Sequence, residues 1–316
     1  MRSSEFEPWM PESLIDGSVR MQDAESEGLG ERRMSAARFE RPFHGVRSLD
    51  KATTPLEQAR QYAPRLKPGQ WFAGISAMRL WGLPSPVPWQ LSEPLRLVVP
   101  HGAYPPQSKG VSASRLVQRR LVTTILEGLP VLQPVESILH ASSQLSSIDV
   151  LIALEALITT SDVYPGRHPA LGAWAPDSVA ERIEAWGKGT AAKRARVALT
   201  RAKVGVDSPQ ETRMRATLTG EGLPEPEIQV VVDLGGEAVR LDTAWPEYRV
   251  AGEYEGDHHR TDARQWHRDI ERERALAAAG WTVIRVTKRD LHARARANLV
   301  GTFRNALAKN GARPPE

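Results

Sequence analysis

The chain has 316 residues, of which 41% are hydrophobic, so it can bury the cores of two domains of ordinary size. It contains no cysteine, which excludes disulfides, thiolate metal sites and cysteine nucleophiles and leaves carboxylates, carbonyls and histidines as metal ligands. Its 42 Lys and Arg against 38 Asp and Glu are a mild basic excess, compatible with a polyanionic partner. No apolar run approaches the roughly 20 residues of a membrane span, so we expect a cytoplasmic protein without membrane contact.

The N-terminal two thirds of the chain contain three segments of different composition. Residues 1–36 are rich in Glu, Ser, Gly and Arg without apolar periodicity, which predicts a disordered leader. Over residues 37–160 short helix and strand patterns alternate with Pro and Gly, which predicts a small α+β domain. Residues 161–205 are predicted to be a linker and a helical connector whose last helix has a basic face, a pattern that is more often solvated than bound to phosphate.

Residues 206–316 are predicted to form a separate domain. Ser208, Pro209 and Glu211 have the spacing of a capping box and begin a helix that runs to about residue 219. Strand patterns follow at 227–234, 239–245 and 249–255, then a helix ending at 280, a strand at 282–287 and an amphipathic helix. The order is α-β-β-β-α-β-α, and the chain as a whole is predicted to be α+β or α/β.

Carboxylates gather on the two strands that flank the turn after residue 245. If Trp245 pairs with Tyr248, the antiparallel register places Asp242, Glu253 and Glu255 on one face of the sheet. Asp242 and Glu253 are then diagonal neighbours about 7–8 Å apart. Such carboxylates can share one hard cation, whereas their repulsion is a cost without it, so this face is a candidate Mg²⁺ site.

Several of the candidate residues also have a purely structural explanation. Glu211 could serve a metal, the capping box or both, and Glu253 would face Arg240 across the strands as an ion pair in this register. The arginines after residue 263 could form surface ion pairs along their helix instead of contacting DNA. An imidazole just beyond the strand end, at His258 or His259, could position or deprotonate water or stabilise a phosphate.

Residues 208–308 resemble the very-short-patch-repair-like branch of the PD-(D/E)XK nucleases. In that family an acidic residue on a capped helix precedes an aspartate on the second strand and then the pattern Glu-x-(Asp/Glu)-Gly-x-x-His. Those positions fall here on Glu211, on Asp242 and on the segment from Glu253 to His259. The family's downstream pattern falls on Asp269, Arg272, Gly280, Trp281, Val283 and Arg285.

The resemblance implies a restriction-endonuclease-like core with a mixed central sheet and an endonuclease that cleaves DNA with Mg²⁺, for which Mn²⁺ can substitute. It implies Asp242, Glu253 and Glu255 as metal ligands, His259 as base or phosphate stabiliser and Glu211 as an outer acid. The DNA contacts it suggests are His258, Arg260, Arg264, Arg268 and Arg272. The parent superfamily usually has lysine where this chain has Glu255, so the role of that lysine would fall to a histidine or to an arginine such as Arg268.

The middle of the chain resembles the C-terminal part of AbiEi-type antitoxins and related viral-defence regulators. The resemblance rests on residues 74–86 and 128–142, where Gln133 and His140 replace the usual threonine and aspartate. It implies a regulatory or DNA-contacting module and a toxin–antitoxin or defence-system partner. The alternative to the endonuclease is therefore a non-catalytic, DNA-binding regulator that retains a nuclease fold.

Overall fold

The computed structural model describes residues 17–24, 26, 34, 38–236, 238–256 and 263–312, and for residues 263–268 it describes the backbone alone. Contacts divide the chain into two compact units: unit 1 comprises 1–150, 167–172 and 177–197, and unit 2 comprises 151–166, 173–176 and 198–316. The domain boundaries expected at 160 and 205 follow composition and stay a prediction. Within the described residues, none of the helices has both the length and the apolar character needed to cross a bilayer.

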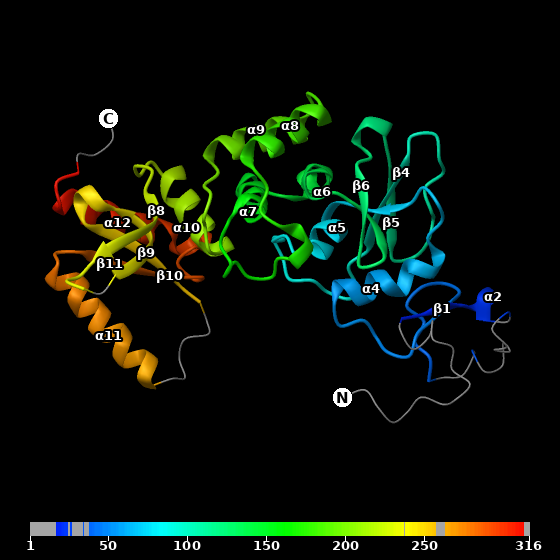
Figure 1. Ribbon diagram of the computed structural model, residues 1–316, viewed down its shortest axis with the longest axis horizontal. Helices are drawn as coiled ribbons and strands as arrows, with labels where there is room; N and C mark the ends of the chain where they lie inside the picture. Colours follow the sequence, from blue (N-terminus) through cyan, green and yellow to red (C-terminus); the bar gives the residue numbers. More distant parts are fainter. Residues whose placement is uncertain are drawn as a thin grey trace. The chain divides into compact units, whose positions relative to one another are not determined.

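Unit 1 is built around a five-stranded mixed sheet with the strand order β5-β4-β3-β7-β6 (Figure 1). Its strands and helices are β1 (Val19–Arg20), α2 (Met21–Ala24), β2 (Val46–Arg47), α4 (Pro55–Tyr62), β3 (Trp71–Phe72), α5 (Gly74–Leu80), β4 (Leu95–Pro100), β5 (Val111–Leu116), β6 (Thr123–Leu126), β7 (Leu129–Leu132) and α6 (Pro134–Ala141), followed by most of α8 (Pro176–Trp186) and the first part of α9 (Thr190–Arg201). The strand β4 is an inner, largely buried strand, whereas β5 is an edge strand.

The N-terminal segment is not a leader throughout. Strand β1 pairs with β2 in an antiparallel register that places Val19 opposite Arg47. Val19, Ala24, Met34 and Phe39 pack together in a small buried cluster. The expected disordered leader over 1–36 is therefore wrong for residues 17–24, because their backbone pairs with β2 and their few apolar side chains pack with Met34 and Phe39. Residues 1–16, 25, 27–33 and 35–36 lie outside the described residues.

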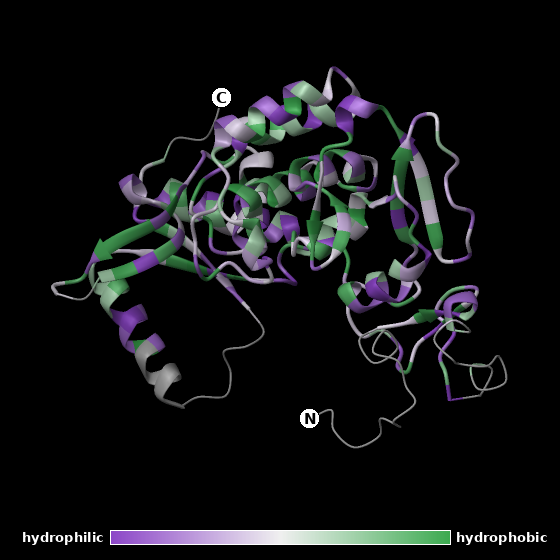
Figure 2. Cartoon of the chain, turned by 45° about the vertical axis from the view of Figure 1, so that its right-hand side comes forward, coloured by the Kyte–Doolittle hydropathy of each residue, from purple (hydrophilic) through white to green (hydrophobic). Residues whose placement is uncertain are grey.

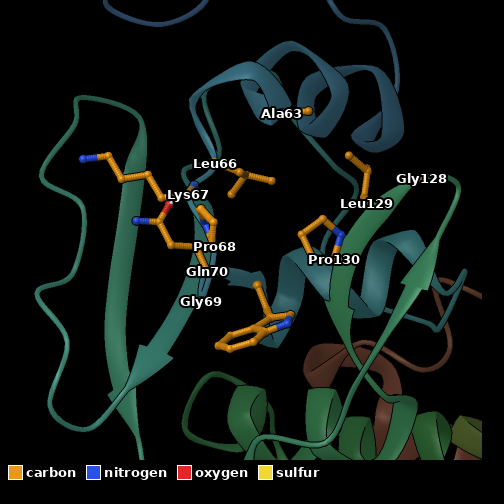
Figure 3. A pocket seen from close by; sticks show the side chains of 10 residues that line it. Ala63, Leu66, Lys67, Pro68, Gly69, Gln70, Gly128, Leu129 and Pro130 are labelled. Atoms are coloured by element: carbon orange, nitrogen blue, oxygen red, sulfur yellow. Dashed lines mark hydrogen bonds between the residues drawn. The ribbon is translucent and has the colours of Figure 1, made fainter.

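An open pocket of about 290 Å³ lies in unit 1 between residues 63–71 and the turn that joins β6 and β7 (Figure 3). Its lining is mostly apolar, with Leu66, Trp71 and Pro130, and Lys67 is the charged side chain at its rim. No carboxylate or histidine is among its lining residues.

Unit 2 contains a four-stranded mixed sheet with the order β11-β10-β9-β8. The elements are most of α7 (Ser147–Ile158), then α10 (Pro209–Gly220), β8 (Glu227–Asp233), β9 (Ala238–Trp245), β10 (Val250–Glu255), α11 (Ala263–Ala278), β11 (Thr282–Thr287) and α12 (Ala293–Lys309). Strands β8, β9 and β10 are antiparallel, and β10 and β11 are parallel. The mixed α and β class and the predicted order of elements are confirmed, while a restriction-endonuclease-like core stays a prediction.

Helices cover both faces of this sheet (Figure 1). On one face, Met214 of α10 and Phe303 of α12 pack with Trp245 and Val250. On the other face, Leu276 of α11 packs against Ala251 and neighbouring side chains. The strands are largely hydrophobic, whereas α11 bears many hydrophilic residues, as expected for a helix with one face in solvent (Figure 2).

Gly252 in the middle of β10 allows α10 and α12 to approach the sheet closely. A Cβ atom at this position would lie 2.8 Å from Cζ of Phe303 and 3.3 Å from Sδ of Met214. The larger side chains on either side of Gly252 would not fit this face. The glycine therefore fixes which residues of β10 face the helices, and it leaves Glu253 on the opposite face.

A buried ion pair joins α7 to α10 within unit 2. The side chains of Glu155 and Arg215 are 0% and 1% exposed, and a guanidinium nitrogen of Arg215 contacts Oε1 of Glu155. The same carboxylate accepts hydrogen bonds from the backbone N–H of Lys203 at 2.7 Å and from the hydroxyl of Thr212. Arg215 also donates to Glu225 at 2.6 Å. This network fixes α10 at its middle turn and so holds the helix that carries Glu211.

Candidate active site

The register of β9 and β10 differs from the predicted one by two residues. Val250 pairs with Trp245 and Gly252 pairs with Thr243. The reason is the turn, because Pro246–Tyr248 form a 3₁₀ turn and Arg249 adopts a left-handed conformation with φ 49°. The chain therefore needs four residues, and not two, to reverse.

The predicted face survives this correction, because a shift of two residues keeps every side chain on its face. One step beyond the last pair places Glu253 opposite Asp242, whereas the predicted register made them diagonal neighbours. The predicted pairing of Glu253 with Arg240 is wrong, since Arg240 forms an ion pair with Asp207.

Asp242 lies where two neighbouring strands separate. The ladder between β9 and β10 ends at Gly252, while the ladder between β10 and β11 continues to Glu255. Oδ2 of Asp242 accepts a hydrogen bond from the backbone N–H of Tyr254 at 2.9 Å and so satisfies a donor that the ladder no longer pairs. Burial raises the pKa of Asp242, and the hydrogen bond from Tyr254 opposes that rise.

Glu211 on α10 is the second carboxylate of the site. The hydroxyl of Ser208 accepts a hydrogen bond from the backbone N–H of Glu211 at 3.2 Å, so the first half of the predicted capping box is confirmed. In the other half, Oε2 of Glu211 accepts the backbone N–H of Asp207 at 3.2 Å, one residue before the N-cap. The amide of Gln229 donates to the same oxygen at 2.7 Å.

The environment of Glu211 makes it unusually basic. Its residue is 7% exposed, and burial, followed by the nearby charge of Asp242, raises the pKa of Glu211 to about 7. A carboxylate whose ionisation is opposed by burial and by a neighbouring carboxylate attracts either a proton or a cation. We call Glu211 and Asp242 the acidic pair.

Gln229 is a member of the site that the sequence did not indicate. It belongs to β8, where its φ of 52° is unusual for a residue with a side chain. Its amide nitrogen binds Glu211, while its Oε1 is buried without a hydrogen-bond partner among the described residues. An unsatisfied carbonyl oxygen on a side chain that binds Glu211 is a further oxygen of the kind that hard cations bind.

Glu253 is close to the acidic pair but is neutralised by an arginine. Arg272 of α11 contacts both carboxylate oxygens of Glu253, at 3.0 Å for Oε2, and also donates to the backbone oxygen of Arg240 at 3.0 Å. Burial raises the pKa of Glu253, and the charge of Arg272 opposes this. Arg272 therefore forms an ion pair with Glu253. The contact of Arg272 with DNA stays a prediction.

Glu255 forms a separate ion pair at the surface. Its partner is Arg285 on β11, which also contacts Glu273 on α11. The three side chains are 38–49% exposed, so the pairs contribute little to stability. The described contacts thus direct Glu255 toward β11 and not toward the acidic pair.

The remaining predicted residues lie beyond what the structure describes. His258, His259 and Arg260 fall in the segment 257–262, outside the described residues. Arg264 and Arg268 belong to α11, but their side chains are likewise outside them. Among the described residues, no group of three or more His, Asp or Glu side chains is arranged to hold a metal ion.

Comparison with known proteins finds two similar sequences. Two uncharacterized proteins of Mycobacterium tuberculosis, from strains CDC 1551 / Oshkosh and H37Rv, are each 35% identical over 86 residues, which are 27% of this chain. The chain spans about a third (32%) of the length of these curated relatives. No protein-family model matches the chain, and no solved structure matches it.

Proposed function

We propose that unit 2 is a metal-dependent DNA endonuclease with its cation site at the acidic pair, Glu211 and Asp242. The observation that carries the proposal is that the charge of Asp242, a half-buried residue of β9 at the point where β9 and β10 separate, acts on the buried Glu211 of α10. Because burial disfavours the ionised form of both carboxylates and the charge of Asp242 adds to this at Glu211, a bound cation would recover that free energy. The resemblance to PD-(D/E)XK nucleases, which includes both residues, supports the same assignment.

The residues present fit Mg²⁺ or Mn²⁺. Mg²⁺ is usually held by one or two carboxylates together with water and substrate phosphate, and not by an all-protein cage. Asp242, Glu211 and the unsatisfied Oε1 of Gln229 supply oxygen ligands of that kind. When bound, the ion would supply positive charge that stabilises the scissile phosphate.

The protein side chains have distinct roles in this proposal. Asp242 is fixed by the backbone of Tyr254 and presents its other oxygen to the site. Glu211 would be the second carboxylate ligand, because the positive charge of the ion would offset the burial and the neighbouring charge of Asp242 that raise its pKa in the free chain. Arg272 holds Glu253 until a DNA phosphate competes for the guanidinium, which would release Glu253 toward the acidic pair.

A specific observation favours the alternative, a non-catalytic DNA-binding regulator. Two of the three predicted metal ligands, Glu253 and Glu255, are neutralised by Arg272 and Arg285. In a regulator these ion pairs would be permanent, and DNA would be bound without cleavage. Such binding would weaken with increasing salt and would not require Asp242.

Cleavage assays decide between the two functions. The full chain is incubated with Mg²⁺ or Mn²⁺ and with duplex, mismatched, branched and single-stranded DNA, and with RNA. We expect the wild type to cut at least one substrate and Asp242→Asn to cut it at least about 100-fold more slowly. The matched control is Asp233→Asn in the same unit, an exposed aspartate that only binds the backbone N–H groups of Gly235 and Gly236.

Equal cleavage by wild type and Asp242→Asn would contradict the proposal. Salt-sensitive DNA binding without cleavage of any substrate, unchanged in Asp242→Asn, would establish the regulator instead.

A further inference from the structure

Unit 1 contains a long stretch of chain without acidic residues. Between Glu93 and Glu127 there are Arg96, Lys109, Arg115, Arg119 and Arg120 but no Asp or Glu. This stretch forms β4, β5 and β6, and β5 is an edge of the sheet. The local excess of positive charge favours the binding of an anion at this part of the sheet.

Arg96 is a cation of this stretch whose side chain is bound by a hydroxyl of the neighbouring strand. It is half-buried on β4, opposite Ser112 of β5, and it donates to the Ser112 hydroxyl at 2.7 Å. No carboxylate of a described residue forms an ion pair with it. By contrast, Arg79 nearby binds Glu93 through two hydrogen bonds at 2.7 and 2.8 Å. A half-buried guanidinium without an anion is costly, so the site is incomplete as it stands.

Ser114 and His140 lie beside this cation. The hydroxyl of Ser114 is 3.0 Å from Nε2 of His140 on α6, and Nδ1 of His140 is buried without a hydrogen-bond partner among the described residues. Burial, followed by the charge of Arg96, lowers the pKa of His140 to about 4, so the imidazole is neutral at pH 7. A proton on Nε2 leaves only a lone pair unpaired at Nδ1, which costs less than an unpaired buried N–H.

The oxygens of Ser112 and Ser114 act as acceptors, so the hydroxyl hydrogens of both serines remain available for donation. The Ser112 oxygen accepts from Arg96, and the Ser114 oxygen accepts from the imidazole in this tautomer. Each hydroxyl can therefore donate its own hydrogen outward. Because Ser112 and Ser114 are two residues apart on β5, both donors lie on the same face of the sheet as Arg96.

We propose that Arg96, Ser112 and Ser114 form a binding site for a phosphate group. The site offers the remaining guanidinium N–H groups and two hydroxyl donors, with one positive charge and no carboxylate among its residues. Phosphate oxygens are strong acceptors and match this set of donors. Lys109 and Arg115, both exposed near β5, would add to the attraction.

The phosphate could belong to a nucleic acid backbone or to a small phosphorylated molecule, and the chemistry at Arg96 is the same for both. The site lies wholly in unit 1, so it does not depend on the function proposed for unit 2. Binding measurements in the presence of a chelator, without Mg²⁺, keep the two proposals separate.

The test uses the full chain and two probes. In the first measurement, the unfolding temperature is recorded at increasing concentrations of inorganic phosphate, with chloride used to keep the ionic strength constant. In the second, binding of labelled duplex and single-stranded DNA is followed by fluorescence anisotropy. We expect Arg96→Gln to weaken binding of the recognised probe by roughly 10-fold or more, and Ser114→Ala by several-fold. Ser114 is exposed, so its variant tests the site even if Arg96→Gln fails to fold. The control is Arg60→Gln, which removes a cation of unit 1 that is already paired with Glu127.

Each outcome decides the matter. If DNA binding falls in Arg96→Gln or Ser114→Ala but not in Arg60→Gln, the site takes a nucleic acid phosphate. If phosphate stabilises the wild type more than either site variant while DNA affinity is unchanged, the site takes a small phosphorylated ligand. If the site variants and the control bind both probes as the wild type does, the proposal is overturned.

Discussion

At the scale of single residues, the burial of His140 predicts acid sensitivity. Its pKa in the folded chain, about 4, lies below the value of 6.5 expected when unfolded. The neutral ring therefore contributes stability that is complete above pH 6.5 and is lost as the pH falls toward 4. We expect urea unfolding to show a loss of stability between pH 7 and pH 4 that is about 3 kcal/mol larger in the wild type than in His140→Gln. The same pH dependence in both chains would mean that His140 is not buried as a neutral ring.

The candidate site shows what residue patterns can and cannot reveal. The alternation of side chains on β9 and β10 predicted that Asp242 and Glu253 share a face, and this parity is confirmed. Gln229 was missed because its role depends on an unusual backbone conformation in β8. The pairing of Glu253 with Arg272 was missed because the two residues are 19 apart in sequence and meet only when α11 packs on the sheet.

At the scale of elements, the buried pair of Glu155 and Arg215 predicts a large effect of single substitutions. Arg215→Met would leave Glu155 charged in a fully buried position, so we expect the free energy of unfolding to fall by roughly 3–5 kcal/mol. Replacing both residues by methionine removes the uncompensated charge and should recover most of that loss. The control is Arg201→Met, whose guanidinium only binds the hydroxyl of Thr219 at an exposed position. A double variant no more stable than Arg215→Met would refute this account of the network.

The elements themselves follow largely from local patterns. The N-cap at Ser208 and the short turns between β8, β9 and β10 predicted the order of helices and strands in unit 2. The turns also predicted antiparallel neighbours, because each is too short for a crossover connection. The predicted register of β9 and β10 was wrong by two residues because of the turn between them. Arg249 adopts a left-handed conformation there, and a sequence usually signals that conformation with glycine. The packing of α7 on α10 had no local signal either, since Glu155 lies in an otherwise apolar stripe.

At the scale of the whole molecule, the two units carry opposite chemistry. Unit 2 has the carboxylates of Glu211 and Asp242 at one site, which suits a cation, whereas no carboxylate of the described residues of unit 1 forms an ion pair with Arg96, which suits an anion. A nearly balanced total charge conceals this separation. It also makes the two proposals independent, since a variant in one unit leaves the other site intact.

The account depends most on whether the acidic pair binds a cation. Titration of the full chain with Mn²⁺, with free Mn²⁺ measured by its electron paramagnetic resonance signal, tests this without knowledge of the substrate. We predict a Mn²⁺ site in the wild type and in Asp233→Asn, with affinity reduced at least about 10-fold in Asp242→Asn and in Glu211→Gln. Equal Mn²⁺ affinity in the wild type and in both site variants would contradict the account.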